Sequence, residues 1–418
     1  MPEKLSPTKL RVGHAIKLPL SWLQHPFMSN KLVIENQHQI RIIQSLKLEY
    51  VYLYPDKSLA APPEPKPASN EEVLRQIDEA AEYRATLQQK KSARIEASKM
   101  RRRSIQKTEK AFNQSFKQLH SLMKKLGSQP VTAIEEASQL TAQMAELIAR
   151  PDALSLHMIA TAQKDQENLY YHALNVSTLS MMLAKNLQLT EQQIQLVGFG
   201  ALFHDIGKLR LPSQIMRKQQ PLTKPEQNLL NLHTQYGAEL AERLSVFPSE
   251  AIPILMQHHE YADGSGFPRG LKEQDIDPLA KIVMVANTFD NLCHPGPGQA
   301  TRSPHTALSY MYRKMRQQLP ETELKLLIKQ MGVYPPGTLV QLSDDRIGMV
   351  ITVNSDALLQ PNIMVYEADI PRLEAPILTL TEDDLAIEKV LKPQQLPAQV
   401  LDYLNPCAQI SYHVQGKQ

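Results

Sequence analysis

The 418-residue sequence predicts a mainly α-helical protein with a small α+β domain at its start and a small β-rich tail at its end. Three observations support this fold class. Residues 71–126 are charged and lack both glycine and proline, apolar residues recur with helical periodicity from about 131 to 330, and alternating apolar runs follow residue 332. A chain of this length exceeds one ordinary core, so we expect several domains. The predicted boundaries are 1–59, 60–130, 131–331 and 332–418.

The first segment mixes short β-like runs at 31–34 and 50–54 with a helix-like stretch near 39–46. Residues 60–70 are rich in proline, which indicates a linker. The long helix predicted after it carries many lysines and arginines, and two interpretations remain open. Either it is a solvated connector or dimer-forming helix, or it is an arm that binds acidic lipid or nucleic acid. Because no aromatic residues alternate with the charges, we expect no nucleic-acid partner.

The composition sets limits on the protein's class. Lys and Arg number 46 against 43 Asp and Glu, and the net charge of +3 implies no particular ligand. Cys293 and Cys407 are the two cysteines, which excludes a disulfide framework and favours a reducing compartment. The sequence shows neither a signal peptide nor an apolar run of the ~18 residues that a membrane span needs. We therefore expect a cytoplasmic protein without a membrane span.

Five of the 13 histidines lie close together in the middle of the sequence, and an aspartate directly follows one of them. Helical periodicity places them on or beside apolar faces. A single inward histidine is usually a hydrogen-bonded core residue. Several buried imidazoles without a shared cation would each cost ~1–3 kcal/mol in desolvation, so the cluster favours a metal site. Its members are His172, His204, Asp205, His233, His258 and His259.

Residues 204–208 read H-D-I-G-K and residues 258–268 read H-H-E-Y-A-D-G-S-G-F-P. Over about residues 150–330 this pattern resembles the HD-GYP family of metal-dependent cyclic di-GMP phosphodiesterases. The resemblance implies an HD-type helical bundle that holds a dinuclear site with two divalent transition-metal ions, iron or manganese. Residues 5–130 resemble, more weakly, the small N-terminal domain often attached to such proteins.

The resemblance also implies roles for individual residues. Asp205 would bridge the two metals and take part in catalysis, together with Lys208, which would contact the scissile phosphate. The implied metal ligands are His172, His204, Asp205, His233, His258, His259 and Asn287, and the implied substrate contacts are Lys208, Phe267, Arg269 and Lys272.

The chain departs from the family pattern at its last predicted metal ligand. Asn287 stands where the family motif A-D-x-x-D-A-L has its first aspartate. Asp290, three residues later, shares a neighbouring helical face and is the alternative ligand. Asp277 is the expected N-cap of this helix, with Pro278 in the first turn.

Other departures concern charge and substrate contacts. Asn168 replaces a glutamate that supports a third metal in some members, and Glu167 is one position out of phase, so two metals are expected. Phe267 replaces the signature tyrosine. The basic motif after the last helix is missing, with Arg302 as the nearest substitute, and His294 is predicted to lie in a surface loop.

The sequence leaves the function open between alternatives. The first is hydrolysis of cyclic di-GMP to pGpG or GMP in bacterial second-messenger signalling. The second is a catalytically weak or inactive protein that binds nucleotide and signals through protein partners. The third is an HD phosphohydrolase that acts on another nucleotide, since one fold serves several substrates.

Overall fold

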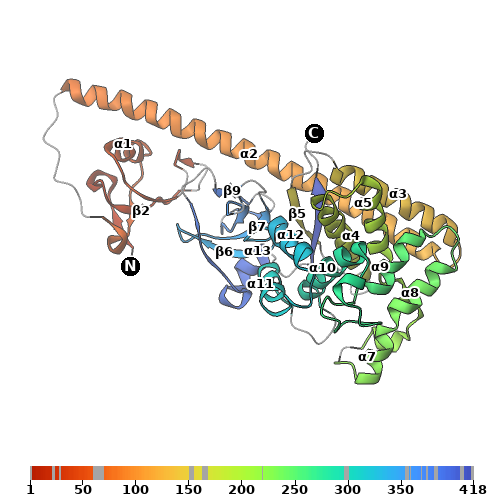
Figure 1. The fold of residues 1–418 in the computed structure, drawn as a ribbon. Coiled ribbons are helices and arrows are strands. Elements are labelled where there is room, and N and C mark those ends of the chain that lie inside the picture. Colours follow the sequence, from red (N-terminus) through yellow and green to blue (C-terminus); the bar gives the residue numbers. More distant parts are fainter. Residues whose placement is uncertain are drawn as a thin grey trace. The chain divides into compact units, whose positions relative to one another are not determined.

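The structure is a computed structural model of the chain (Figure 1). It describes all residues except 1, 21–23, 28–29, 60–69, 150–154, 162–167, 219, 296–300, 354–356, 358, 369, 373–374, 381–384, 405–408 and 416–418. The predicted linker therefore lies outside the described residues. Within the described part of the chain, none of the helices combines the length and apolar character of a membrane span.

The mainly α-helical fold with small sheets near both ends of the chain is confirmed. The helices are α1 (Gln37–Ser45), α2 (Asn70–Lys125), α3 (Pro130–Ala149), α4 (Asn168–Asn186), α5 (Glu191–Phe203), α6 (Ser213–Met216), α7 (Lys224–Asn231), α8 (His233–Glu242), α9 (Ile252–Gln257), α10 (Pro278–Cys293), α11 (Pro304–Lys314), α12 (Glu321–Met331) and α13 (Ala398–Leu404). The strands are β1 (Glu3–Leu5), β2 (Ala15–Lys17), β3 (Lys31–Val33), β4 (Val51–Leu53), β5 (Ser155–Thr161), β6 (Leu339–Leu342), β7 (Ile347–Thr352), β8 (Asn362–Val365), β9 (Ile377–Thr379), β10 (Ile387–Val390) and β11 (Gln409–Gln415).

The chain divides into two compact units, Met1–Arg101 and Arg102–Gln418. In the first unit, four short antiparallel strands form a sheet in the order β1-β4-β2-β3. Helix α1 begins at its N-cap Asn36, whose side chain accepts a hydrogen bond from the Gln39 backbone N–H. Its apolar face contributes Ile40, Ile42 and Ile43 to a small core with residues from the strands.

Helix α2 runs without interruption for 56 residues, as its lack of glycine and proline predicts. The expectation of a wholly solvated basic helix is wrong at Lys91, which is only 5% exposed. Its ammonium group donates to the backbone carbonyls of His25 and Phe27, at 2.6 and 2.9 Å. This lysine therefore fastens the 24–27 segment to the helix inside the first unit.

The second unit is built around the helices that carry the histidine cluster. Helices α4 and α5 pack closely against each other, and α3, α9 and α10 cover them. Thr190 begins α5 with a capping box to Gln193, and the helix is apolar almost all round, so it is buried in the centre. Asp277 is the N-cap of α10 and Pro278 opens it, as predicted.

A seven-stranded antiparallel sheet completes the second unit. Its main order is β10-β6-β7-β5-β11, with β8 paired to β7 and β9 paired to β8. Strands β6 and β7 lie in the region after residue 332 where alternating apolar runs are predicted. Strand β5 differs from the prediction, because it lies within the 131–330 stretch for which the sequence predicts helices. Buried residues of this C-terminal part, such as Met349 and Ile351, belong to the same hydrophobic cluster as the helices.

Gly207 explains how the H-D-I-G-K segment packs. It lies in the short 3-10 helix η5 (Ile206–Arg210), which rests against α8. A Cβ atom at this position would lie 1.9 Å from the His233 carbonyl oxygen and 2.5 Å from the Gly237 nitrogen. Only glycine allows this approach of the two backbones.

We expect Gly207→Ala to lower the free energy of unfolding by roughly 1–3 kcal/mol, because the added methyl group must separate η5 from α8. Denaturant unfolding followed by circular dichroism measures this. Gly127→Ala is the matched control, since a Cβ there has no neighbour within 4 Å. Equal unfolding midpoints for the two variants would contradict this account of the packing.

Candidate metal centre

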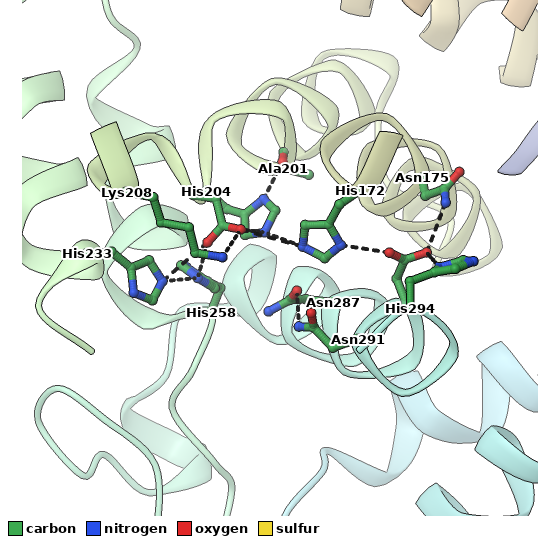
Figure 2. Close-up of polar contacts among 12 residues, drawn as sticks. His172, Asn175, Ala201, His204, Lys208, His233, His258, Asn287, Asn291 and His294 are labelled. Carbon is green, nitrogen blue, oxygen red and sulfur yellow. Dashed lines mark hydrogen bonds and ion pairs between the residues drawn. The ribbon is translucent and has the colours of Figure 1, made fainter. Parts of the chain in front are cut away.

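The six residues of the predicted cluster come together from four segments of the second unit. Figure 2 labels four of them, His172, His204, His233 and His258. His172 lies in α4, His204 and Asp205 follow α5, His233 begins α8, and His258 and His259 follow α9. Potential ligand atoms of Asp205, His233, His258 and His259 all lie within 4.8 Å of one another. The same holds for His172, His204 and Asp205.

Asp205 belongs to both groups, and its two carboxylate oxygens face different imidazoles. Oδ2 lies 3.6 Å from His172 Nε2 and 3.4 Å from His204 Nε2. Oδ1 lies 3.3 Å from His233 Nε2 and 3.9 Å from His258 Nε2. A carboxylate that presents one oxygen to each of two imidazole pairs has the arrangement of a bridging ligand between two cations.

Backbone carbonyls fix the tautomers of three of these histidines. The Nδ1–H groups of His204, His233 and His258 donate to the carbonyls of Ala201, Leu230 and Leu255, at 2.6, 2.7 and 3.0 Å. A carbonyl can only accept, so each Nδ1 carries the proton and each Nε2 of a neutral ring keeps a lone pair. All three lone pairs therefore belong to the nitrogens that meet around Asp205.

The inward nitrogens satisfy the requirements of a cation site. His172 Nε2 lies 3.1 Å from His204 Nε2, and His233 Nε2 lies 3.3 Å from His258 Nε2. Two lone pairs at this distance repel each other unless a cation or a proton lies between them. Oδ1 of Asp205 is buried and has no hydrogen-bond partner among the residues that the structure describes. This donor set of imidazoles and a carboxylate fits divalent transition metals.

The protonation states of the site also suit metal binding. Burial lowers the pKa of His204 to about 4, and it also lowers the pKa values of His233, His258 and His259. Burial alone would raise the pKa of Asp205. The Lys208 ammonium, 2.5 Å from Oδ2, and the surrounding imidazoles outweigh this effect and hold that pKa well below its usual value. These four histidines are neutral and the aspartate is ionised at neutral pH.

Helix α10 places its two candidate ligands differently. Asn287 is buried, and its side-chain oxygen accepts a hydrogen bond from Asn291 at 2.7 Å. Figure 2 shows this hydrogen bond between Asn291 and Asn287, drawn below His172 in the view. The Asp290 carboxylate accepts a hydrogen bond from His172 Nδ1 at 2.7 Å, at the edge of the ring that faces away from His204. The structure therefore does not place Asp290 among the converging ligand atoms.

The loop after His259 carries three of the four predicted substrate contacts, and the fourth, Lys208, lies in η5. Phe267 stacks on the His259 ring, with 4.7 Å between centroids and an interplanar angle of 20°. Arg269 and Lys272 are exposed on the same loop. The structure thus brings Phe267 to the histidine cluster and leaves the positively charged side chains of Arg269 and Lys272 at the surface.

Glu260 is a residue whose role the sequence reasoning missed. Its fully buried carboxylate accepts hydrogen bonds from the backbone N–H groups of Arg269 and Leu271, at 2.7 and 2.9 Å. Gly266 allows the loop to pass close to this residue, because a Cβ there would lie 2.5 Å from the Glu260 backbone. The only sequence signal for this role of Glu260 was its place as the third residue of the H-H-E motif. Glu260 shapes the loop that carries Phe267.

Two other predictions differ from the structure or fall outside it. His294 does not lie in a surface loop: its side chain is 16% exposed and its Nδ1 donates to Asp290 at 3.1 Å. Arg302 stacks its guanidinium over Tyr310 at 4.4 Å. Glu167 and residues 296–300 lie outside the described residues, and of Asn168 the structure describes only the backbone.

Comparison with known proteins places this geometry in context. Residues 135–320 match an HD domain, and residues 3–137 match a domain of unknown function, DUF3391. The cyclic di-GMP phosphodiesterase PA4108 of Pseudomonas aeruginosa is 27% identical over 370 residues, which cover 88% of this chain and 85% of that protein. The resemblance to an HD-type hydrolase with its N-terminal domain is confirmed.

Two further relatives match over shorter stretches. The cyclic di-GMP phosphodiesterase response regulator RpfG of Xanthomonas campestris is 33% identical over 138 residues, 33% of this chain and 36% of that protein. The 3'3'-cGAMP-specific phosphodiesterase 3 of Vibrio cholerae is 27% identical over 164 residues, 39% of this chain and 35% of that protein.

The lowered histidine pKa values predict a pH-dependent stability. Between pH 6.5 and about 4 the unfolded chain binds protons that folded His204 does not, so the free energy of unfolding falls as the pH falls. We expect this effect of His204 to lower the free energy of unfolding of the metal-free protein by about 1–3 kcal/mol across this pH range. Denaturant unfolding at several pH values measures it. His204→Asn should show a shallower pH dependence, and a slope equal to that of the wild type would contradict the assignment.

Proposed function

We propose that this chain is a metal-dependent phosphodiesterase with an HD domain and that it hydrolyses cyclic di-GMP. The observation that carries the proposal is the Asp205 carboxylate, which faces one imidazole pair with each oxygen and lies beside the Lys208 ammonium. The relative from Pseudomonas aeruginosa supports the choice of substrate, because its similarity extends over most of both chains.

We propose that His172, His204, His233, His258, His259 and Asp205 hold two divalent metal ions, iron or manganese, with Asn287 as an additional ligand. When bound, such ions lower the pKa of water and neutralise charge on a phosphodiester. The chain's own residues do the remaining work. Asp205 fixes the distance between the two imidazole pairs, and the tautomers set by Ala201, Leu230 and Leu255 keep the lone pairs directed inward.

Lys208 and Phe267 are proposed to act on the substrate. The Lys208 side chain is 20% exposed, and its charge is available to stabilise the negative charge that develops on the phosphate. Phe267 offers an aromatic ring, already seated on His259, to a base or sugar of the nucleotide. Arg269 and Lys272 add positive charge at the edge of the same loop. We expect pGpG or GMP as the product and a cytoplasmic location.

A second substrate, 3'3'-cGAMP, is favoured by the relative from Vibrio cholerae. The two cyclic dinucleotides share the phosphodiester ring and differ in one base, so the metal centre alone does not distinguish them. Competition between labelled cyclic di-GMP and 3'3'-cGAMP in one reaction, read as the ratio of kcat/KM values, decides between them. A ratio that favours 3'3'-cGAMP would overturn the proposed substrate.

Metal content tests the centre itself. We expect about two transition-metal ions per chain, because the six ligands form two groups that share Asp205. Elemental analysis after aerobic and anaerobic purification measures the content. Less than about half an equivalent of metal under both conditions would reject the proposed centre.

Substitutions at Asp205 and Lys208 should separate metal binding from the stabilisation of negative charge on the substrate. Asp205→Ala should abolish hydrolysis and lower the metal content, whereas Lys208→Ala should keep the metal and slow turnover by roughly 100-fold or more. Arg210→Ala is the matched control: Arg210 lies in the same 3-10 helix but pairs with Glu239. Its activity should be unchanged. Equal metal loss in the Asp205 and Lys208 variants would contradict the assigned roles.

A further inference from the structure

The Asp290 carboxylate lies in the interior of the helical domain and is fully buried. Its Oδ2 accepts a hydrogen bond from His172 Nδ1 at 2.7 Å. Its Oδ1 accepts from Asn175 Nδ2 at 3.0 Å and from His294 Nδ1 at 3.1 Å. Both oxygens are therefore engaged by side chains of α4 and of the residue that ends α10. Figure 2 shows His172 between His204 on one side and Asn175 and His294 on the other.

His172 differs from the other histidines of the centre in what holds its outer nitrogen. His204, His233 and His258 stand at helix ends and donate to carbonyls of the last turn, which have no N–H group four residues later in the same helix. His172 lies inside α4, where the carbonyls of the preceding turn take part in the helix. A side-chain acceptor is therefore needed to fix this ring, and Asp290 is that acceptor.

An acceptor with a full negative charge does more than a carbonyl does. A carboxylate on the outer nitrogen makes the imidazole a more basic ligand and fixes its orientation. Helix α10 offers only the neutral amide of Asn287 on the side of the ligand cluster. Three side-chain nitrogens, His172 Nδ1, Asn175 Nδ2 and His294 Nδ1, donate to the Asp290 carboxylate, and hydrogen bonds of this kind favour its charged form. One negative charge thus lies directly behind His172.

We propose that Asp290 is a positioning residue: it holds His172 with its Nε2 lone pair directed at the metal, and it supplies from behind this ring the negative charge that Asn287 does not bring. The inference rests on the metal centre of the proposed function and goes beyond it. Asn175 and His294 have the supporting role of keeping the Asp290 carboxylate from rotating away.

Metal affinity tests the inference directly. The metal-stripped protein is titrated with Mn²⁺ in competition with a fluorescent chelator. Asp290→Asn and Asp290→Ala should each lower the affinity for at least one of the two Mn²⁺ ions by about 10- to 100-fold. This is the usual effect of removing a hydrogen-bond partner of a metal-binding histidine. Asp277→Asn is the matched control, because it makes the same chemical change at the N-cap of the same helix, where asparagine caps equally well.

A charge relocation tests the second half of the inference. Asn287→Asp alone should tighten Mn²⁺ binding. The double substitution Asn287→Asp with Asp290→Asn keeps the total charge and moves it to the ligand side, so it should recover most of the affinity that Asp290→Asn loses. If the Asp290 variants bind Mn²⁺ as tightly as Asp277→Asn does, or if the double variant is as weak as Asp290→Asn, the inference is overturned.

The tautomer of His172 gives a readout that needs neither metal nor substrate. In metal-free protein labelled with ¹⁵N-histidine, NMR should show His172 protonated at Nδ1 only, and Asp290→Ala should produce a mixture of tautomers. An unchanged His172 signal in Asp290→Ala would overturn the positioning role. Because neither measurement uses cyclic di-GMP, a failure of the proposed substrate is distinguishable from a failure of this inference.

Discussion

The buried Asp205 carboxylate is the group on which the rest of the helical domain depends. Burying an isolated carboxylate is costly, so the surrounding groups must compensate it. In this structure the compensation comes from Lys208 and from imidazoles of three separate helical segments. A domain that must bring these segments around one carboxylate has little freedom in how its helices cross. Gly207 illustrates the constraint, since η5 meets α8 without space for a single methyl group.

The centre uses the ends of helices as part of its structure. A helix end leaves carbonyls without partners, and an imidazole three residues later can satisfy one of them. Ala201, Leu230 and Leu255 all have this relation to a histidine of the cluster. The same hydrogen bond that completes the helix end therefore selects the tautomer needed for a metal. At these positions, one hydrogen bond both caps the helix end and fixes the tautomer of the histidine.

The sequence predicted which six side chains come together, because the pattern that marks them is local. A histidine on an apolar helical face is visible from periodicity, and the motif spacing fixes which segments belong together. The long helix α2 and strands β6 and β7 were predictable for the same reason. Contacts between distant residues were not. The burial of Lys91 depends on carbonyls 64 and 66 residues away, and the Asp290–His172 bond joins residues 118 apart. No local pattern encodes such pairings.

The departures from the family pattern affect charge and hydrogen bonding rather than the frame of the site. Phe267 lacks the hydroxyl of a tyrosine, but its ring still stacks on His259, and Glu260 still fixes the loop through two backbone N–H groups. Asn287 lacks a charge, but the buried Asp290 retains one a helical turn away. Packing and electrostatics can thus change independently: the hydrogen bonds and ring contacts that orient the histidine cluster are intact, while Phe267 and Asn287 differ from the family pattern in hydrogen bonding and charge.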